Sequence, residues 1–179
     1  MAGCNDENAV SDEVLLKVMV QEEVNRKSEE ERDIESRKRN IIIYRVPEKK
    51  TDSVAERKTN DAIFVKDLLD GVFDMKVEDC DVEKMYRLGR WSEDKARPLL
   101  VTFRNYEKKE HIIENLRNLR QAVDKFKRIG ISHDLHPKER EEIKLMIEES
   151  KQEYIAGGGE NTENYRFVVV GKGQRHKVI

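Results

Sequence analysis

The chain has 179 residues, of which 40% are charged, yet its formal net charge at pH 7 is only −2. This balance excludes a histone-like or protamine-like protein. Compact apolar runs such as residues 41–43 and 168–170 interrupt the charge and argue against a fully disordered chain. High charge with little net excess favours long solvated helices around a modest core.

Membrane and secreted proteins are also excluded at this stage. No apolar stretch approaches the roughly 18 residues that a membrane helix needs, and the first residues lack the basic and apolar regions of a secretory signal. The two cysteines, Cys4 and Cys80, stand far apart, which suits neither a disulfide framework nor a zinc site. We therefore expect a cytoplasmic or nuclear protein without membrane association.

Residues 1–36 form a charged arm. The first 40 residues hold 7 Lys/Arg and 11 Asp/Glu, so they carry −4 and the remainder carries +2. One helical stripe of apolar residues is predicted in the arm: Val10, Val14, Leu15, Val18 and Met19. It supplies about two heptads, whereas a coiled coil needs three or four. The arm is therefore either a solvated, partly helical leader or the end of an oligomerising helix.

Residues 37–132 follow a βαββαβ pattern. Strands are predicted at residues 40–46, 82–88, 97–104 and 128–132. Ser53 and Glu56 form a capping box that starts the first helix, and Gly71 is predicted to end it. Apolar residues between Ile112 and Leu119 have helical spacing and predict the second helix. Two strand–helix–strand units predict an α+β protein with a ferredoxin-like sandwich.

Residues 133–179 predict a small C-terminal domain. Pro137 suits the first turn of a helix, which the glycines at 157–159 would end. Two strands at 165–170 and 175–179 then read as a β-hairpin around the turn at 171–173. The final 16 residues contain four Lys/Arg and no acid, so they carry +4.

Strand alternation sorts the residues of the predicted sheet into two faces. The more apolar set is expected to meet the helices: Ile41, Ile43, Leu99, Val101, Phe103, Ile129 and Ile131. The helix-free face is then expected to carry Ile42, Tyr44, Leu100, Thr102, Arg104 and Arg128. This would be a mildly apolar, basic surface with one aromatic side chain.

An RNA-recognition motif has this architecture and stacks bases on aromatic residues of this face, with a third strand that reads K/R-G-F/Y-G/A-F-V-x-F/Y. Residues 97–104 read RPLLVTFR and keep the basic start and a V-x-F pattern, but no aromatic occupies the stacking positions. Ile42 also stands where the first strand would carry an aromatic. Binding is therefore expected to depend on Arg and Lys contacts to phosphates, with little sequence preference.

The candidate nucleic-acid-binding residues lie before the first strand, around the sheet and in the C-terminal hairpin. They are Arg37, Lys38, Arg39, Tyr44, Arg87, Arg90, Arg97, Arg104, Arg128, Arg166, Lys172, Arg175 and Lys177. The strongest indication of phosphate binding comes from Arg87, Arg90 and Arg97. These arginines flank both ends of the loop at 89–96, near one rim of the predicted sheet. For each cation the alternative is a solvated surface charge.

Motifs for catalysis, metals and cofactors are not evident in the sequence. The glycines at 157–159 lack the strand, helix and lysine of a phosphate-binding loop. His133, Asp134 and His136 are close in sequence, but no nucleophile or zinc-like spacing accompanies them. We therefore expect a protein that is not an enzyme and holds no cofactor.

The order of several short motifs resembles a known family, the first-open-reading-frame protein (ORF1-type, transposase-22-like) of LINE non-LTR retrotransposons. The matching stretches are RNIII with VPE at 39–48, YRLGR at 86–90, RPLLVTF at 97–103 with YEKK at 106–109, and IGIS with DL at 129–135. Together they extend the resemblance over about residues 37–179.

The resemblance implies a trimer-forming coiled coil, a noncanonical RNA-recognition motif and a small C-terminal domain. Such proteins bind single-stranded RNA or DNA, coat their own transcript as a ribonucleoprotein and act as nucleic-acid chaperones. By position, the resemblance makes Arg87, Arg90 and Arg97 backbone-binding residues and places the C-terminal hairpin in the binding cleft. The alternative is a protein-interaction module that assembles through the arm and residues 137–155 and binds no nucleic acid.

Overall fold

The computed structural model describes residues 6–48, 51, 53–93, 95–159, 169–170 and 177–178. It separates the chain into two compact units, unit 1 (residues 1–134) and unit 2 (residues 135–179). In the described residues the protein is α+β, with four α-helices and a four-stranded antiparallel sheet.

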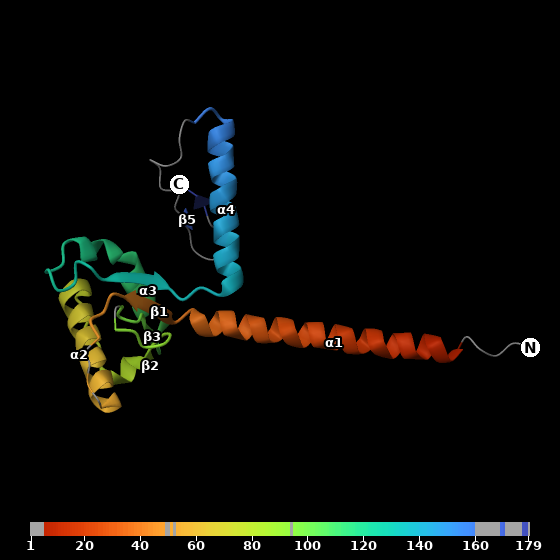
Figure 1. Cartoon of the computed structure of the whole chain (residues 1–179), viewed down its shortest axis with the longest axis horizontal. Helices are drawn as coiled ribbons and strands as arrows, with labels where there is room; N and C mark the ends of the chain where they lie inside the picture. The colour runs from red at the N-terminus through yellow and green to blue at the C-terminus, as the bar shows by residue number, and fades with distance from the viewer. Residues whose placement is uncertain are drawn as a thin grey trace, which may run out of the picture. The chain divides into compact units, whose positions relative to one another are not determined.

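Unit 1 contains the sheet and three of the helices (Figure 1). Its elements are α1 (Asp6–Arg37), β1 (Asn40–Tyr44), α2 (Val54–Phe73), β2 (Val82–Arg87), β3 (Leu99–Phe103), α3 (Tyr106–Glu114) and β4 (Gly130–His133). Short 3-10 helices, η1 (Asp79–Asp81) and η2 (Leu116–Arg120), precede β2 and follow α3. The strands lie in the order β2-β3-β1-β4, and every neighbouring pair is antiparallel.

Unit 2 consists of α4 (Pro137–Ala156) and a pair of short antiparallel strands, β5 (Val169–Val170) and β6 (Lys177–Val178). The helix begins with a capping box in which Glu139 accepts from the backbone N–H of His136, and Pro137 occupies its first turn. Both strands approach α4.

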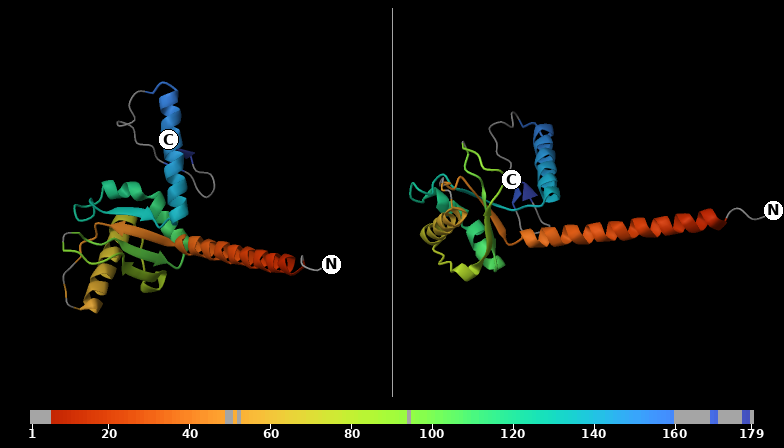
Figure 2. Two further views of the ribbon diagram at one scale, coloured as in Figure 1. Left: turned by 45° about the vertical axis from the view of Figure 1, so that its right-hand side comes forward. Right: turned by 60° about the horizontal axis from the view of Figure 1, so that its bottom comes forward.

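The core of unit 1 lies between the sheet and helices α2 and α3, which cover one face of it (Figure 2). The five residues predicted to point inward from β1 and β3 are all fully buried there: Ile41, Ile43, Leu99, Val101 and Phe103. From the helices, Leu68, Leu69 and Ile112 complete the layer. Alternation along the strands thus predicts the core face correctly.

The opposite face of the two central strands is less open than the sequence suggests. Ile42, Leu100 and Thr102 are only 6%, 5% and 7% exposed. Strands β1 and β3 each have a neighbouring strand on both sides. Tyr86 of β2 pairs with Leu100 and Ser132 of β4 pairs with Ile42, so residues of the outer strands flank those of the central strands. The exposed groups of this face therefore lie toward its edges and not at its centre.

The end of α2 differs from the prediction. Gly71 lies inside the helix, which continues to Phe73 and ends at Asp74 in the left-handed conformation (φ 49°). Asp74 donates its backbone N–H to the carbonyl of Leu69 and so caps the helix. The two residues that the helix gains beyond Gly71 include Phe73, which is buried in the core, and this burial offsets the cost of a glycine in a helix.

Helix α1 carries apolar side chains that the rest of the described chain does not cover. Seven of them are about half exposed or more: Val14, Leu15, Leu16, Val18, Met19, Val20 and Val24. No described helix is both long enough and apolar enough to span a bilayer.

Candidate nucleic-acid interface

Five arginines collect at one end of the sheet. Because β1 and β2 run opposite to β3 and β4, the ends of the first two strands meet the starts of the other two. The residues at this end, named here the arginine rim, are Arg45, Arg87, Arg90, Arg97 and Arg128. The topology thus assembles them from four separate segments of the chain.

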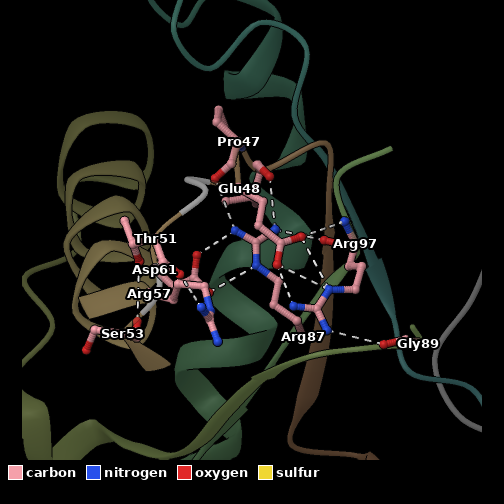
Figure 3. A network of polar contacts seen from close by, with 10 residues as sticks. Pro47, Glu48, Thr51, Ser53, Arg57, Asp61, Arg87, Gly89 and Arg97 are labelled. Atoms are coloured by element: carbon pink, nitrogen blue, oxygen red, sulfur yellow. Dashed lines mark hydrogen bonds and ion pairs between the residues drawn. The ribbon is translucent and has the colours of Figure 1, made fainter. Parts of the chain in front are cut away.

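Arg87 is the centre of a buried polar network (Figure 3). It faces the helices because it stands opposite Leu99, a core residue of β3. Its side chain is 6% exposed, and that of its ion-pair partner Asp61 on α2 is 14% exposed. It donates to both Asp61 carboxylate oxygens (3.0 and 2.5 Å) and to the carbonyls of Val46 (2.9 Å), Pro47 (3.1 Å) and Arg97 (2.8 Å).

These bonds use all five N–H donors of the Arg87 guanidinium. The side chain thereby connects the loop after β1, helix α2 and the segment that precedes β3. The phosphate contact predicted for Arg87 does not fit this arrangement, because no donor is left for a ligand. Arg87 therefore connects the segments that form the rim, and its donors are all engaged within the chain.

Arg97 is half-buried and paired with Glu48 of the loop after β1. Its Nη2 and Nε atoms lie 2.5 and 3.2 Å from Glu48 Oε1, and its backbone N–H also donates to this carboxylate (3.3 Å). Its Nη1 donates to the carbonyl of Gly89 (3.3 Å). The hydrogen bonds from the Arg97 side chain hold the pKa of Glu48 below its ordinary value of 4.5, against the opposing effect of burial.

This pair gives a pH-dependent contribution to stability. A carboxylate whose pKa is lowered by folding stabilises the protein above its unfolded pKa and loses that contribution as the pH falls through the folded one. We therefore expect Glu48→Gln to lower the free energy of unfolding by about 1–3 kcal/mol at pH 7. Urea denaturation at pH 7, 5.5, 4.5 and 3.5 should show the two proteins converging toward the acid end. A gap that stays constant across this range would contradict the assignment.

The remaining rim arginines have a different environment. The side chains of Arg45, Arg90 and Arg128 are exposed, and none forms a hydrogen bond or ion pair with another described residue. Glu48 and Asp61 are engaged by Arg97 and Arg87, so they neutralise the buried part of the rim. Three cationic groups therefore remain open to an anionic ligand at this end of the sheet.

Two tyrosines provide aromatic surface on the helix-free face. Tyr44, at the end of β1, is 38% exposed, and its hydroxyl lies 3.3 Å from Ser132 Oγ on β4. Tyr86 on β2 stands opposite Leu100 and is 51% exposed. Tyr86 is not among the residues predicted for this face, although strand alternation indicates it, because its neighbours Met85 and Arg87 point to the helices.

The cations at the opposite end of the sheet are mostly paired. Arg37 binds Asp33 and the buried Asp134 (both 2.9 Å), Lys38 binds Glu35 (2.5 Å), and Arg39 binds Glu83 (2.9 Å). Asp134 also accepts from the Asn40 side chain (2.9 Å). Arg104 is exposed there, and its backbone N–H donates to the backbone carbonyl of Asp81 (2.9 Å). These contacts make the 37–39 segment a connection between α1 and the sheet.

The hairpin candidates lie largely outside the described residues. Arg166, Lys172 and Arg175 fall outside them altogether, while Lys177 belongs to β6 but its side chain is not described. Within the described parts of the chain, no group of three or more His, Cys, Asp or Glu residues is arranged to hold a metal ion.

Comparison with models of known protein families and with curated proteins found no match to this chain.

Proposed function

We propose that this chain binds single-stranded RNA or DNA with little sequence preference, through the exposed part of the arginine rim and the adjoining helix-free face. The observation that carries the proposal is the set of three exposed arginines without an acidic partner among the described residues, at the end of the sheet where Tyr44 is also exposed. Arginine contacts to phosphates bind nucleic acids without reading their sequence.

The arrangement of unit 1 supports a ferredoxin-like assignment within the α+β class. Its chain order is β1-α2-β2-β3-α3-β4 and its strand order is β2-β3-β1-β4, with both helices on one face. This topology leaves the other face free of helices within unit 1, which is the face that RNA-recognition motifs use. We therefore propose that unit 1 is an RNA-recognition motif in which arginines replace most of the aromatic platform.

The motif resemblance at residues 37–179 extends the proposal to biological role. We propose that the chain is a LINE ORF1-type component of a ribonucleoprotein particle, with nucleic-acid chaperone activity and no catalytic activity of its own. The binding mechanism is electrostatic: arginines neutralise phosphates and release condensed counterions, so the observed affinity depends on salt.

A salt titration of the full chain tests this proposal. Each phosphate contact on a single strand contributes about −0.7 to the slope of log K against log salt, so three contacts predict a slope near −2. Affinity for a fluorescent single-stranded RNA should therefore fall roughly 20-fold between 50 and 200 mM salt. Anisotropy with several unrelated sequences should give similar values. Absence of salt-sensitive binding at low ionic strength would rule the proposal out.

A second candidate function is assembly through α1, which its exposed apolar residues between Val14 and Val24 favour. Buried against copies of itself, this stretch would form a homo-oligomer, with the trimer implied by the resemblance as the specific expectation. Light scattering of the full chain and of the double variant Leu15→Glu/Val18→Glu separates the two ideas. If α1 alone sets the oligomeric state and RNA has no effect on either protein, the chain is an interaction module only.

A further inference from the structure

Arg45 has an unusual backbone conformation immediately after β1. Its φ is +63°, and Asp74 is the only other non-glycine residue with a positive φ in the described chain. Asp74 caps α2, and its short polar side chain tolerates this conformation. For a long side chain such as arginine the left-handed region is costly, and glycine or asparagine would be the easier choice. The bend turns Val46 into the core, which explains the backbone but not the choice of side chain.

The Arg45 side chain lies over Gly130, the first residue of β4. A Cβ atom placed on Gly130 would stand 3.3 Å from Arg45 Nη2 and 3.8–3.9 Å from two atoms of Tyr44. Gly130 is also the residue that pairs with Tyr44 in the sheet, so this space belongs to the helix-free face. The space left by the missing side chain of Gly130 is thus bordered by both the Arg45 guanidinium and the Tyr44 side chain.

The chemistry of this group suits one nucleotide of a single strand. The guanidinium is exposed and makes no hydrogen bond or ion pair with another described residue, so its donors are available. Tyr44 is exposed beside it and is anchored by its hydroxyl to Ser132. An aromatic face accepts an unpaired base, and an arginine fork accepts the phosphate that accompanies it.

We propose that Tyr44 and Arg45, seated over Gly130, form a nucleotide-binding pair in which Tyr44 stacks a base and Arg45 binds the adjacent phosphate. This inference rests on the proposed function and adds to it a site that requires unstacked bases. It assigns the presence of an arginine, rather than a glycine or asparagine, at this strained position to ligand binding. Gly130 acts as a positioning residue.

The first test is Arg45→Gly in the full chain, because it should change two properties in opposite directions. Glycine relieves the left-handed strain, so the folding equilibrium constant measured by urea denaturation should rise roughly threefold. Affinity for single-stranded RNA should fall about five- to tenfold, and the salt slope should shrink by about 0.7. Arg117→Ala, which removes an exposed charge from η2, is the matched control and should leave binding unchanged.

The second test is Gly130→Ala, which alters no charge. Its Cβ would displace the flexible end of the Arg45 side chain, so affinity should fall about threefold or more while stability changes little. Arg45→Lys should retain the salt slope yet lose affinity, because an ammonium lacks the planar fork. If the wild-type chain binds no single strand, the proposed function fails. If it binds and both Arg45→Gly and Gly130→Ala match Arg117→Ala, only the Arg45 site is overturned.

Discussion

Replacing Arg87 with alanine is expected to destabilise unit 1 by about 3–5 kcal/mol, the cost of removing one partner from a buried ion pair. The change would leave the Asp61 carboxylate and the carbonyls of Val46, Pro47 and Arg97 without their donor in a largely buried setting. The free energy of unfolding of a single domain is about 5–15 kcal/mol, so a loss of this size would remove a large fraction of it. Urea denaturation followed by circular dichroism measures it.

Arg90→Ala is the matched control for this experiment, since Arg90 lies only three residues further along and its side chain is exposed. Its stability should stay within about 0.5 kcal/mol of the wild type. The double variant Arg87→Met/Asp61→Leu should recover much of the loss, because it removes both charges together. A stability of Arg87→Ala close to that of Arg90→Ala would show that the network does not support the fold.

The triple variant Arg45→Ala/Arg90→Ala/Arg128→Ala is expected to bind single-stranded RNA on the order of 10²-fold more weakly than the wild type at low salt. The slope of log K against log salt should shrink by about 2, because three phosphate contacts are lost. Folding should persist, since none of the three side chains contacts another described residue by hydrogen bond or ion pair. Anisotropy across a salt series and a thermal melt provide the two readouts.

A control with the same change in net charge separates local contacts from overall attraction. Lys66, Arg117 and Arg120 are exposed on α2 and η2 and can be replaced together by alanine. This control should retain most of the affinity, because long-range charge is screened beyond about 10 Å in ordinary buffers. Equal losses in the two triple variants would mean that binding depends on net charge alone and not on the arginine rim.

Local sequence patterns predict the elements of unit 1 well because each carries its own signal. The β-branched run at 41–43, the cap at Ser53 and the alternation of Leu99, Val101 and Phe103 depend only on neighbouring residues. The predicted helix end at Gly71 is wrong, because the helix continues in order to bury Phe73. That gain depends on the folded core and cannot be read from neighbouring residues.

The division of the arginines into buried and exposed groups could not be predicted in the same way. Arg87 is buried and Arg97 is half-buried because they pair with Asp61 and Glu48, which lie 26 and 49 residues away in the chain. Such pairings require the folded topology. The left-handed backbone at Arg45 likewise has no local signal, because nothing in an arginine side chain favours that conformation.

The contact between Arg37, Asn40 and Asp134 has a consequence for how the sheet of unit 1 is connected to the rest of the chain. It joins the residues at which the sheet begins and ends, on the adjacent strands β1 and β4. The chain therefore enters and leaves this module at one shared corner, and the arginine rim lies at the far end of the same strands. Residues 37–134 thus have their chain connections at one end of the sheet and the arginine rim at the other.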